Sequence, residues 1–316
     1  MRVGLVLGGG GVVGASWMVG ALQALEDEVG FRADHAARVL GTSAGALVGA
    51  LGAAGVSPQE MSRYASSTAS SIVGDAAGPY RVSLWPPPVG FGSPRMAAAM
   101  LRQQRDRSLG AFVMGLLPRG AINADPIQRL VERVVGASWP VAPSLRVVAC
   151  DYRTGQRLTF GSSWAPDSSV GAAVAASCAI PAFFRPVQIG ERSYIDGGIH
   201  SHSNLDLIAN EELDLVICLS PMSSRATTSV ATVLERIAAA RRRRAAAALT
   251  AEARVLEERG IELVVLEPEI EDLEAMGSNP MARDRSERVI ETARLTAARA
   301  LRRLSLPATL SPATVR

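Results

Sequence analysis

One serine lies between glycines at a position where a nucleophile could be held. Ser43 is the centre of the motif GTSAG, which follows the apolar run ARVL and precedes the small-residue stretch ALVGALGAAG. A G-x-S-x-G motif between a strand and a helix is typical of a nucleophile elbow, because Gly41 and Gly45 permit a sharp turn and the helix dipole points at the hydroxyl. An ordinary turn serine is the alternative, and this motif alone does not separate the two.

A serine nucleophile needs a base. The chain has three histidines, His35, His200 and His202, and none follows residue 202. An α/β-hydrolase triad runs in the order serine, acid, histidine, so the late histidine of that order is missing. The base must therefore be one of these three histidines or a carboxylate.

An aspartate followed by two glycines supplies a candidate carboxylate. Asp196 comes after an apolar pair and directly before Gly197 and Gly198, in the stretch SYIDGGIHSHSN. The two glycines relax the backbone, so that the carboxylate could approach another segment closely. The alternative is an Asp-Gly hairpin turn with a purely structural function.

A glycine run, GGGGVVG, covers residues 8–14 between a predicted strand and a predicted helix. Unobstructed N–H groups at a helix N-terminus bind negative charge, either a phosphate or the oxyanion of a tetrahedral intermediate. Gly9, Gly11 and Gly14 also fit the dinucleotide fingerprint of a Rossmann-type oxidoreductase. That alternative needs an acidic residue at the end of a second strand; Asp34 has suitable spacing, but EVGFRADH is a poor strand.

The elements that must position these motifs alternate between strands and helices. Short apolar runs predict strands over residues 2–7, 37–40, 144–152, 156–160, 214–220 and 261–268. Helical patterns cover residues 15–28, 46–55, 168–180, 229–260 and 282–304. This alternation predicts an α/β fold of three layers, α/β/α, with a mostly parallel central sheet.

One segment interrupts the alternation. Residues 63–120 contain three consecutive prolines, which neither a helix nor a central strand can continue, and predict an inserted helical and proline-rich cap. Its apolar side chains could line an acyl groove, touch a bilayer or complete a core: Trp85, Phe91, Met96, Met100, Phe112 and Met114. We expect one domain over residues 1–305, cap included, followed by a flexible C-terminal tail over 306–316.

Composition is that of a soluble globular protein, with 48% hydrophobic and 20% charged residues among 316. The net charge of +3 does not predict nucleic-acid binding. Arg241–Arg244 fall in a predicted helix, where successive residues turn by about 100°, so a solvated face is favoured over contact with anionic lipid. The glycine run argues against a signal peptide, and no other stretch is apolar enough to span a bilayer.

The chain has three cysteines, Cys150, Cys178 and Cys218, each in an apolar context. An odd number of cysteines in such contexts indicates buried free thiols in a reducing compartment. We therefore expect a cytoplasmic protein, with peripheral membrane contact as a further option.

The glycine run, GTSAG and the Asp-Gly-Gly occur in an order that resembles the patatin-like phospholipase family. The block AASCAIPAFFRPV also resembles that family's helix, Ile-Pro break and Phe-x-Pro segment ahead of the aspartate. The similarity extends from Arg2 to about Leu219 and does not cover the proline-rich insertion. The resemblance implies a patatin-like fold and a lipid acyl hydrolase of phospholipase A or lysophospholipase type, acting on a lipid or other acyl ester.

The resemblance also implies the site residues. In that family a Ser–Asp dyad works without histidine, so Ser43 would be the nucleophile and Asp196 the general base. The N–H groups of Gly9, Gly10 and Gly11 would form the oxyanion hole, with no cofactor and no metal.

The family's loop usually has arginine or lysine where this chain has Val13. A cation at that position cannot help to bind an anionic head group here. A non-catalytic lipid-binding relative and an acyltransferase remain alternatives, and the oligomeric state is open.

Overall fold

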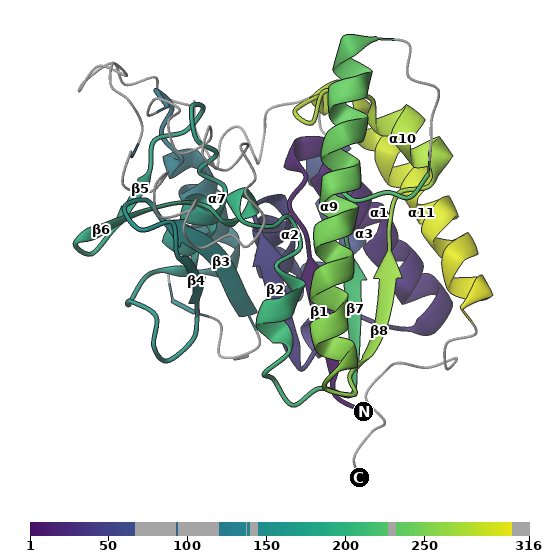
Figure 1. Ribbon diagram of the computed structural model, residues 1–316, viewed down its shortest axis with the longest axis horizontal. Helices are drawn as coiled ribbons and strands as arrows, with labels where there is room; N and C mark the ends of the chain where they lie inside the picture. The colour runs from purple at the N-terminus through teal and green to yellow at the C-terminus, as the bar shows by residue number, and fades with distance from the viewer. Residues whose placement is uncertain (67–92, 94–119, 137, 140–144, 227–231, 305–316) are drawn as a thin grey trace.

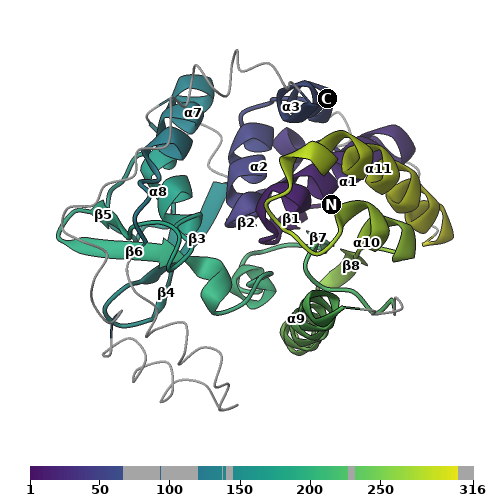
Figure 2. The ribbon, with the colours of Figure 1, turned by 90° about the horizontal axis from the view of Figure 1, so that it is seen from above.

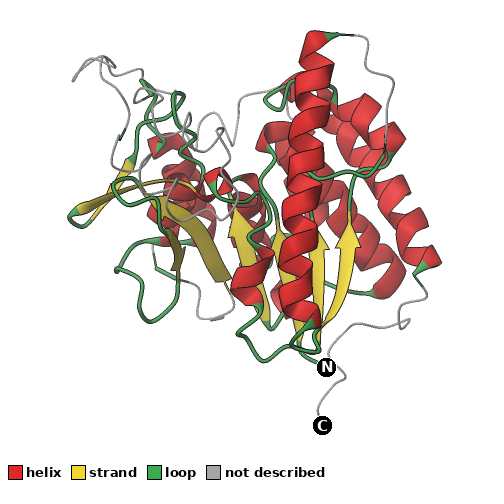
Figure 3. Cartoon of the chain, viewed as in Figure 1, coloured by secondary structure: helices red, strands yellow, loops and turns green. Residues whose placement is uncertain are grey.

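The computed structural model describes residues 1–66, 93, 120–136, 138–139, 145–226 and 232–304 (Figure 1). In this part the chain forms one sheet of eight strands with helices against it (Figure 3). The strands are β1 Val3–Leu7, β2 Arg38–Thr42, β3 Leu145–Asp151, β4 Arg157–Phe160, β5 Val187–Ile189, β6 Arg192–Asp196, β7 Leu215–Leu219 and β8 Glu262–Leu266. The α-helices are α1 Gly11–Val29, α2 Ala44–Ala53, α3 Pro58–Ser66, α7 Asp125–Val135, α8 Val170–Ser177, α9 Val233–Glu257, α10 Ile270–Met276 and α11 Ser286–Arg303. The short 3₁₀ helices are η1 Ala33–His35, η2 Gly197–Ile199, η3 Leu205–Ile208 and η4 Arg283–Arg285.

The strand order is β5-β6-β3-β2-β1-β7-β8, and β4 also pairs with β3. Strands β3, β2, β1, β7 and β8 are parallel to one another, whereas β4, β5 and β6 are antiparallel to their partners. The predicted mostly parallel sheet is therefore confirmed, and all six predicted strands are present. The antiparallel pair β5–β6 was not predicted.

The central strands are buried on both faces, as expected for parallel strands covered by helices. Along β1, Leu5 and Leu7 face the layer of α1, α2 and α11, while Val6 between them faces α9 and η3. All three side chains are 0% exposed. Seen from above, α9 lies on one side of the sheet and α1 and α11 lie on the other (Figure 2). These are the three layers that the sequence predicts.

Helices α1 and α11 pack very closely, and α1 is the helix that begins at the glycine run. A side chain at Gly20 of α1 would overlap the Ile290 carbonyl of α11 and lie 2.9 Å from Ala293 Cβ. Below this contact Trp17 is 1% exposed. Glycine and alanine at the contact thus let the two backbones approach, and α1 is fixed in place behind the glycine loop.

Several expectations from the sequence concern residues outside the described part. Helix α3 occupies the start of the predicted cap, but most of residues 63–120, the six apolar residues named for it and the tail 306–316 lie outside the described residues. The three cysteines are buried and unpaired, as predicted. Among the described helices, none has the length and apolar character needed to cross a membrane.

Candidate active site

Ser43 lies on a sharp turn between β2 and α2. Its backbone has φ 53° and ψ −121°, a conformation that residues with a side chain rarely adopt. The turn requires small neighbours, since a Cβ at Gly41 would lie 2.5 Å from Ala46 Cα and a side chain at Gly45 would overlap the Leu7 carbonyl. The serine therefore has the strained strand–turn–helix geometry of a nucleophile elbow.

The end of α8 holds the backbone of Ser43. The Ser43 N–H donates to Ser177 Oγ at 2.8 Å, and the Ser177 hydroxyl donates to the Val148 carbonyl at 2.6 Å. The Cys178 thiol donates to the Ser43 carbonyl at 3.2 Å. All of these contacts are buried, so α8 and β3 together stabilise the unusual backbone angles of the serine.

Asp196 is the last residue of β6 and pairs with Ala149 of β3. Its Oδ2 accepts a hydrogen bond from Ser43 Oγ at 2.7 Å, and its Oδ1 accepts one from the Gly198 N–H at 2.7 Å. The side chains are nearly enclosed, with Asp196 5% and Ser43 7% exposed. The chain continues from Asp196 into η2, a 3₁₀ helix, and not into the two-residue hairpin that was the structural alternative.

Gly197 must lack a side chain because a Cβ there would lie 2.6 Å from the Val148 carbonyl. Burial raises the pKa of Asp196 from its ordinary 3.8 to about 6, although the hydrogen bonds from Ser43 and Gly198 favour the charged form. Asp196 is therefore a stronger base than an exposed aspartate and still loses its proton below neutral pH.

The glycine loop lies beside the serine, since a Cβ built at Gly9 would be 3.3 Å from Ser43 Cβ. The N–H of Gly9 donates to the His202 carbonyl at 2.8 Å. The N–H groups of Gly10 and Gly11, at the start of α1, make no hydrogen bond within the described part of the chain. Gly10 and Gly11 thus offer donors to an anion at the α1 N-terminus, while Gly9 holds the loop to the segment after η2.

The loop shape depends on close approach to two prolines. Gly11 has φ 64°, and a Cβ there would lie 2.6 Å from the Pro280 carbonyl, which also accepts the Val13 N–H at 3.1 Å. A Cβ at Gly10 would lie 2.9 Å from Pro221 Cγ, and one at Gly14 would lie 3.3 Å from the same atom. The Val13 side chain is 2% exposed, so this position contributes an apolar wall.

Of the three histidines, His202 is the one beside the dyad. Its Nδ1 would lie 3.5 Å from a Cβ at Gly9 and 3.4 Å from one at Gly198. Burial, followed by the charges of Arg241 and Arg242, lowers the pKa of His202 to about 4, so the imidazole is neutral at pH 7. Within the described residues the Ser43 hydroxyl donates to Asp196 and to no histidine.

The other two histidines do not reach the serine by any described contact. His200 has a pKa lowered to about 4, first by burial and then by the charge of Arg157. His35 is exposed in η1. Sequence reasoning missed Ser177, whose contact with Ser43 joins residues 134 positions apart. It considered His202 either as a base or as part of a surface loop, and in the structure the His202 carbonyl accepts the Gly9 N–H.

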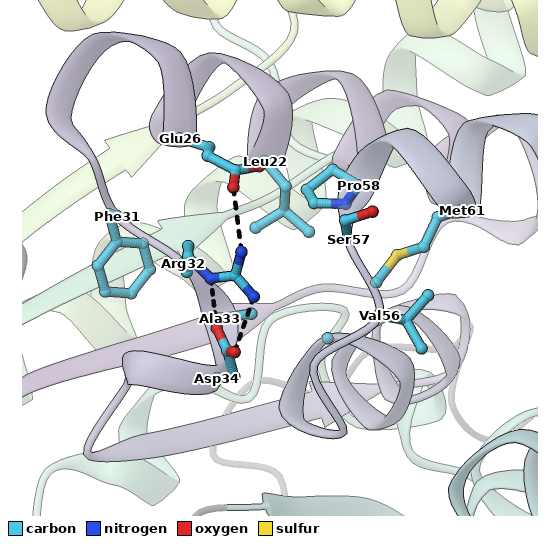
Figure 4. Close-up of a pocket in the computed structure, with 11 residues that line it drawn as sticks. Leu22, Glu26, Phe31, Arg32, Ala33, Asp34, Val56, Ser57, Pro58 and Met61 are labelled. Carbon is cyan, nitrogen blue, oxygen red and sulfur yellow. Dashed lines mark hydrogen bonds and ion pairs between the residues drawn. The ribbon is translucent and has the colours of Figure 1, made fainter.

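A small pocket at the other end of α1 bears on the nucleotide-binding alternative (Figure 4). There Arg32 forms ion pairs with Asp34 at 2.9 Å and with Glu26 at 3.4 Å. Asp34 belongs to η1, ahead of β2, whereas a dinucleotide site needs its acid at the carboxyl end of the second strand. The acid that this alternative requires is therefore absent from the place where it would act.

Comparison with known proteins gives a family match over most of the chain. Residues 5–208 match the sequence model described as patatin-like phospholipase. Among solved structures, the type III effector protein ExoU is similar at 15% identity and a TM-score of 0.37, over 98% of this chain and 56% of that one. VipD from Legionella pneumophila is similar at 14% identity and a TM-score of 0.42, over 95% of this chain and 67% of that one. The chain thus spans little more than half the length of ExoU.

Proposed function

Because the chain belongs to the patatin-like phospholipase family, we propose that it is a lipid acyl hydrolase in which Ser43 is the nucleophile and Asp196 the general base. The observation that carries the proposal is the 2.7 Å hydrogen bond from Ser43 Oγ to Asp196 Oδ2, between two nearly enclosed side chains. A nucleophile and a base within hydrogen-bond distance are the minimum for covalent acyl transfer.

In the first half of the proposed reaction, Ser43 Oγ attacks the carbonyl carbon of an ester and its proton passes to Asp196. The N–H groups of Gly10 and Gly11 stabilise the oxyanion, a contribution of roughly 3 kcal/mol per donor in comparable sites. Asp196 then gives the proton to the departing alkoxide, and an acyl-serine remains.

In the second half, water attacks the acyl-serine. Asp196 takes a proton from this water, a second tetrahedral intermediate forms, and collapse of the intermediate returns the proton to Ser43 as the fatty acid leaves. Gly198 supports both halves, because its N–H bond to Oδ1 leaves Oδ2 directed at Ser43. The raised pKa of Asp196 brings its basicity closer to the working pH, as general-base catalysis requires.

Contact with a membrane surface is part of the proposal, because a lipid ester is presented at an interface. Three apolar side chains are exposed, one between α8 and β5 and two in the first turns of α9: Phe183 at 45%, Val233 at 70% and Ile237 at 53%. Co-sedimentation with phospholipid vesicles tests this part, and an Ile237→Glu, Val233→Glu variant should bind vesicles less. Equal sedimentation of the variant and wild type would contradict it.

The experiment for the function is labelling with a fluorescent fluorophosphonate beside hydrolysis of p-nitrophenyl butyrate. Wild type should be labelled and active, Ser43→Ala should lose both, and Asp196→Asn should lose turnover. Ser163→Ala and Asp167→Asn are matched controls, since both residues are exposed and outside the site. An unlabelled wild type with background turnover would refute the proposal.

A further inference from the structure

Helix α9 extends past the sheet at the end where the glycine loop lies. The helix packs against one face of the sheet, and its N-terminal half continues beyond the carboxyl ends of β7 and β8 (Figure 1). Over the sheet, its inward side is formed by Ala245, Leu249 and Leu256, all less than 9% exposed. One turn earlier, the same inward side carries Arg242, so an arginine replaces the apolar residue beyond the sheet.

A cavity lies under this part of the helix, and we call it the α9 cavity. Helix α9 contributes Ala238, Arg241 and Arg242, whose i, i+3, i+4 spacing places them on one helical face. Facing them are Val13 in the first turn of α1 and the segment after α10. The remaining lining residues are Met222, Gly277, Ser278 and Pro280.

The α9 cavity holds positive charge that no described acid neutralises. Arg242 is half-buried, and one of its N–H groups, on Nη1, donates to the Pro221 carbonyl at 3.0 Å. Burial, followed by the charge of Arg241, lowers the pKa of Arg242 to about 10. Within the described part of the chain, neither arginine forms an ion pair with a carboxylate. The half-buried Arg242 guanidinium, next to a second, exposed arginine, is in an unfavourable position without an anion.

The α9 cavity shares its walls with the glycine loop. Pro221, which accepts from Arg242, packs against Gly10, where a Cβ would lie 2.9 Å from its Cγ. Pro280 in turn accepts the Val13 N–H and lies against Gly11. The charges of both arginines also reach His202, whose carbonyl holds Gly9. An anion in the cavity would therefore lie next to the proposed oxyanion hole.

We propose that the α9 cavity binds the phosphate group of a lipid ester substrate through Arg241 and Arg242, while the ester carbonyl of the same molecule lies at Ser43. This phosphate site specifies the substrate of the proposed hydrolase, and the inference rests on that proposed function. Guanidinium groups match the geometry of phosphate oxygens and form paired hydrogen bonds with them. Ser278, whose hydroxyl is a neutral hydrogen-bond donor, lines the opposite wall. The preferred substrates are thus phospholipids or lysophospholipids, in preference to uncharged acylglycerols.

The first experiment compares two substrates with the same acyl chain, 1-oleoyl lysophosphatidic acid and 1-monooleoylglycerol. For Arg241→Gln and for Arg242→Gln, the ratio of kcat/KM for the phosphorylated to the uncharged substrate should fall about tenfold or more from that of wild type. Arg242→Lys should recover part of the ratio, because it retains the charge. Arg243→Gln and Arg244→Gln are matched controls, since both residues are exposed on other faces of the same helix.

The second experiment measures binding without turnover, by calorimetry in the Ser43→Ala background. The ligands are 1-oleoyl lysophosphatidic acid, sn-glycerol 3-phosphate and inorganic phosphate, each titrated with and without the Arg241→Gln, Arg242→Gln double change. Loss of lysolipid binding in the double variant supports the proposal. Equal binding with and without the arginines overturns it, and so does binding of the two small phosphates but not of the lysolipid.

The two experiments distinguish a failure of the proposed hydrolase function from a failure of the proposed phosphate site. Phosphate binding that depends on the arginines, in a protein that hydrolyses no ester, would refute the hydrolase function while the phosphate site stands. The phosphate site alone would be refuted if Arg241→Gln and Arg242→Gln both hydrolyse esters with the wild-type ratio of kcat/KM for the phosphorylated to the uncharged substrate. Because Arg241 is exposed, its replacement keeps the test valid if Arg242→Gln lowers stability.

Discussion

The hydroxyl of Ser177 accepts the backbone N–H of Ser43 at 2.8 Å, so the turn that carries the serine is held by a residue 134 positions further along the chain. Ser177 is 0% exposed, and its hydroxyl donates a hydrogen bond to the Val148 carbonyl. The Ser43 N–H is therefore engaged in the core and is not available to a substrate oxyanion, which is consistent with the proposed use of the glycine loop.

Replacing Ser177 with alanine should leave the Ser43 N–H without a partner in the core. We expect the free energy of unfolding to fall by about 1–3 kcal/mol, the cost of an unsatisfied buried donor. Turnover should fall at least about tenfold, because the elbow can relax. Denaturant unfolding and p-nitrophenyl butyrate kinetics measure the two effects, with Ser163→Ala as control. Full activity in Ser177→Ala would show that the elbow needs no support from α8.

The pH dependence of kcat/KM should follow the titration of the Asp196 carboxyl. Its pKa of about 6 predicts that kcat/KM is constant above pH 7 and falls about tenfold per unit below pH 6. His202, with a pKa of about 4, would instead place the fall two units lower. A pH–rate profile with a neutral ester distinguishes them, and a bend near pH 4 would contradict the assignment of the base.

The same pKa shift has a consequence for stability. Burial raises the folded-state pKa of Asp196 above the unfolded value of 3.8, so the folded state binds the proton more tightly and its stability decreases as pH rises from about 4 to 6. Asp196→Asn removes this cost, so its free energy of unfolding at pH 8 should exceed that of wild type by on the order of 3 kcal/mol or less, and its Tm should be higher. An unchanged Tm at pH 8, with Asp167→Asn as reference, would argue against a buried charge.

Gly11 and Gly30 allow a matched test of the glycine loop. Both have φ 64°, but a Cβ at Gly11 would lie 2.6 Å from the Pro280 carbonyl, whereas a Cβ at Gly30 meets no atom within 4 Å. Alanine at either position costs about 1 kcal/mol of backbone strain. Only Gly11→Ala should also lower kcat/KM, by roughly a hundredfold, because it displaces oxyanion donors. Similar activities in the two variants would remove the loop from the mechanism.

His202→Gln tests whether the site works without a histidine base. The His202 carbonyl, not its ring, holds Gly9, so the backbone contact survives the change. We expect fluorophosphonate labelling at Ser43 to persist and turnover to stay within about fivefold of wild type. A loss as large as that of Asp196→Asn would transfer the role of base to the imidazole.

Much of the fold could be predicted from local pattern. The runs that became β1, β7 and β8 are apolar at every or nearly every position, because both faces of these strands are covered. The strand β5 could not be predicted, since it has three residues and lies at the edge of the sheet. The 3₁₀ turn after Asp196 could not be predicted either, because the sequence Asp-Gly-Gly fits a hairpin turn equally well.

The candidate site was predictable where a motif carries its own geometry and not where a role depends on distant partners. Ser43 and Asp196 became candidates because their glycines permit a turn and a close approach, and the resemblance to the patatin-like family implied their roles. Ser177 and Arg242 have no local signal, because one acts through a contact across the core and the other is one of four consecutive arginines. Arg242 is also less solvated than predicted, since the helix turns it toward Pro221.

The register between β3 and β6 sets more than the shape of the sheet edge. Thr42 pairs with Val148, and Asp196 pairs with the next residue, Ala149, so the serine and its carboxylate are aligned through one shared strand. A slip of one residue would turn Asp196 to the opposite face. The number of residues that join α3 to α7, by contrast, does not enter this alignment. That connection could therefore become longer or shorter in evolution while β3 keeps Ser43 and Asp196 side by side.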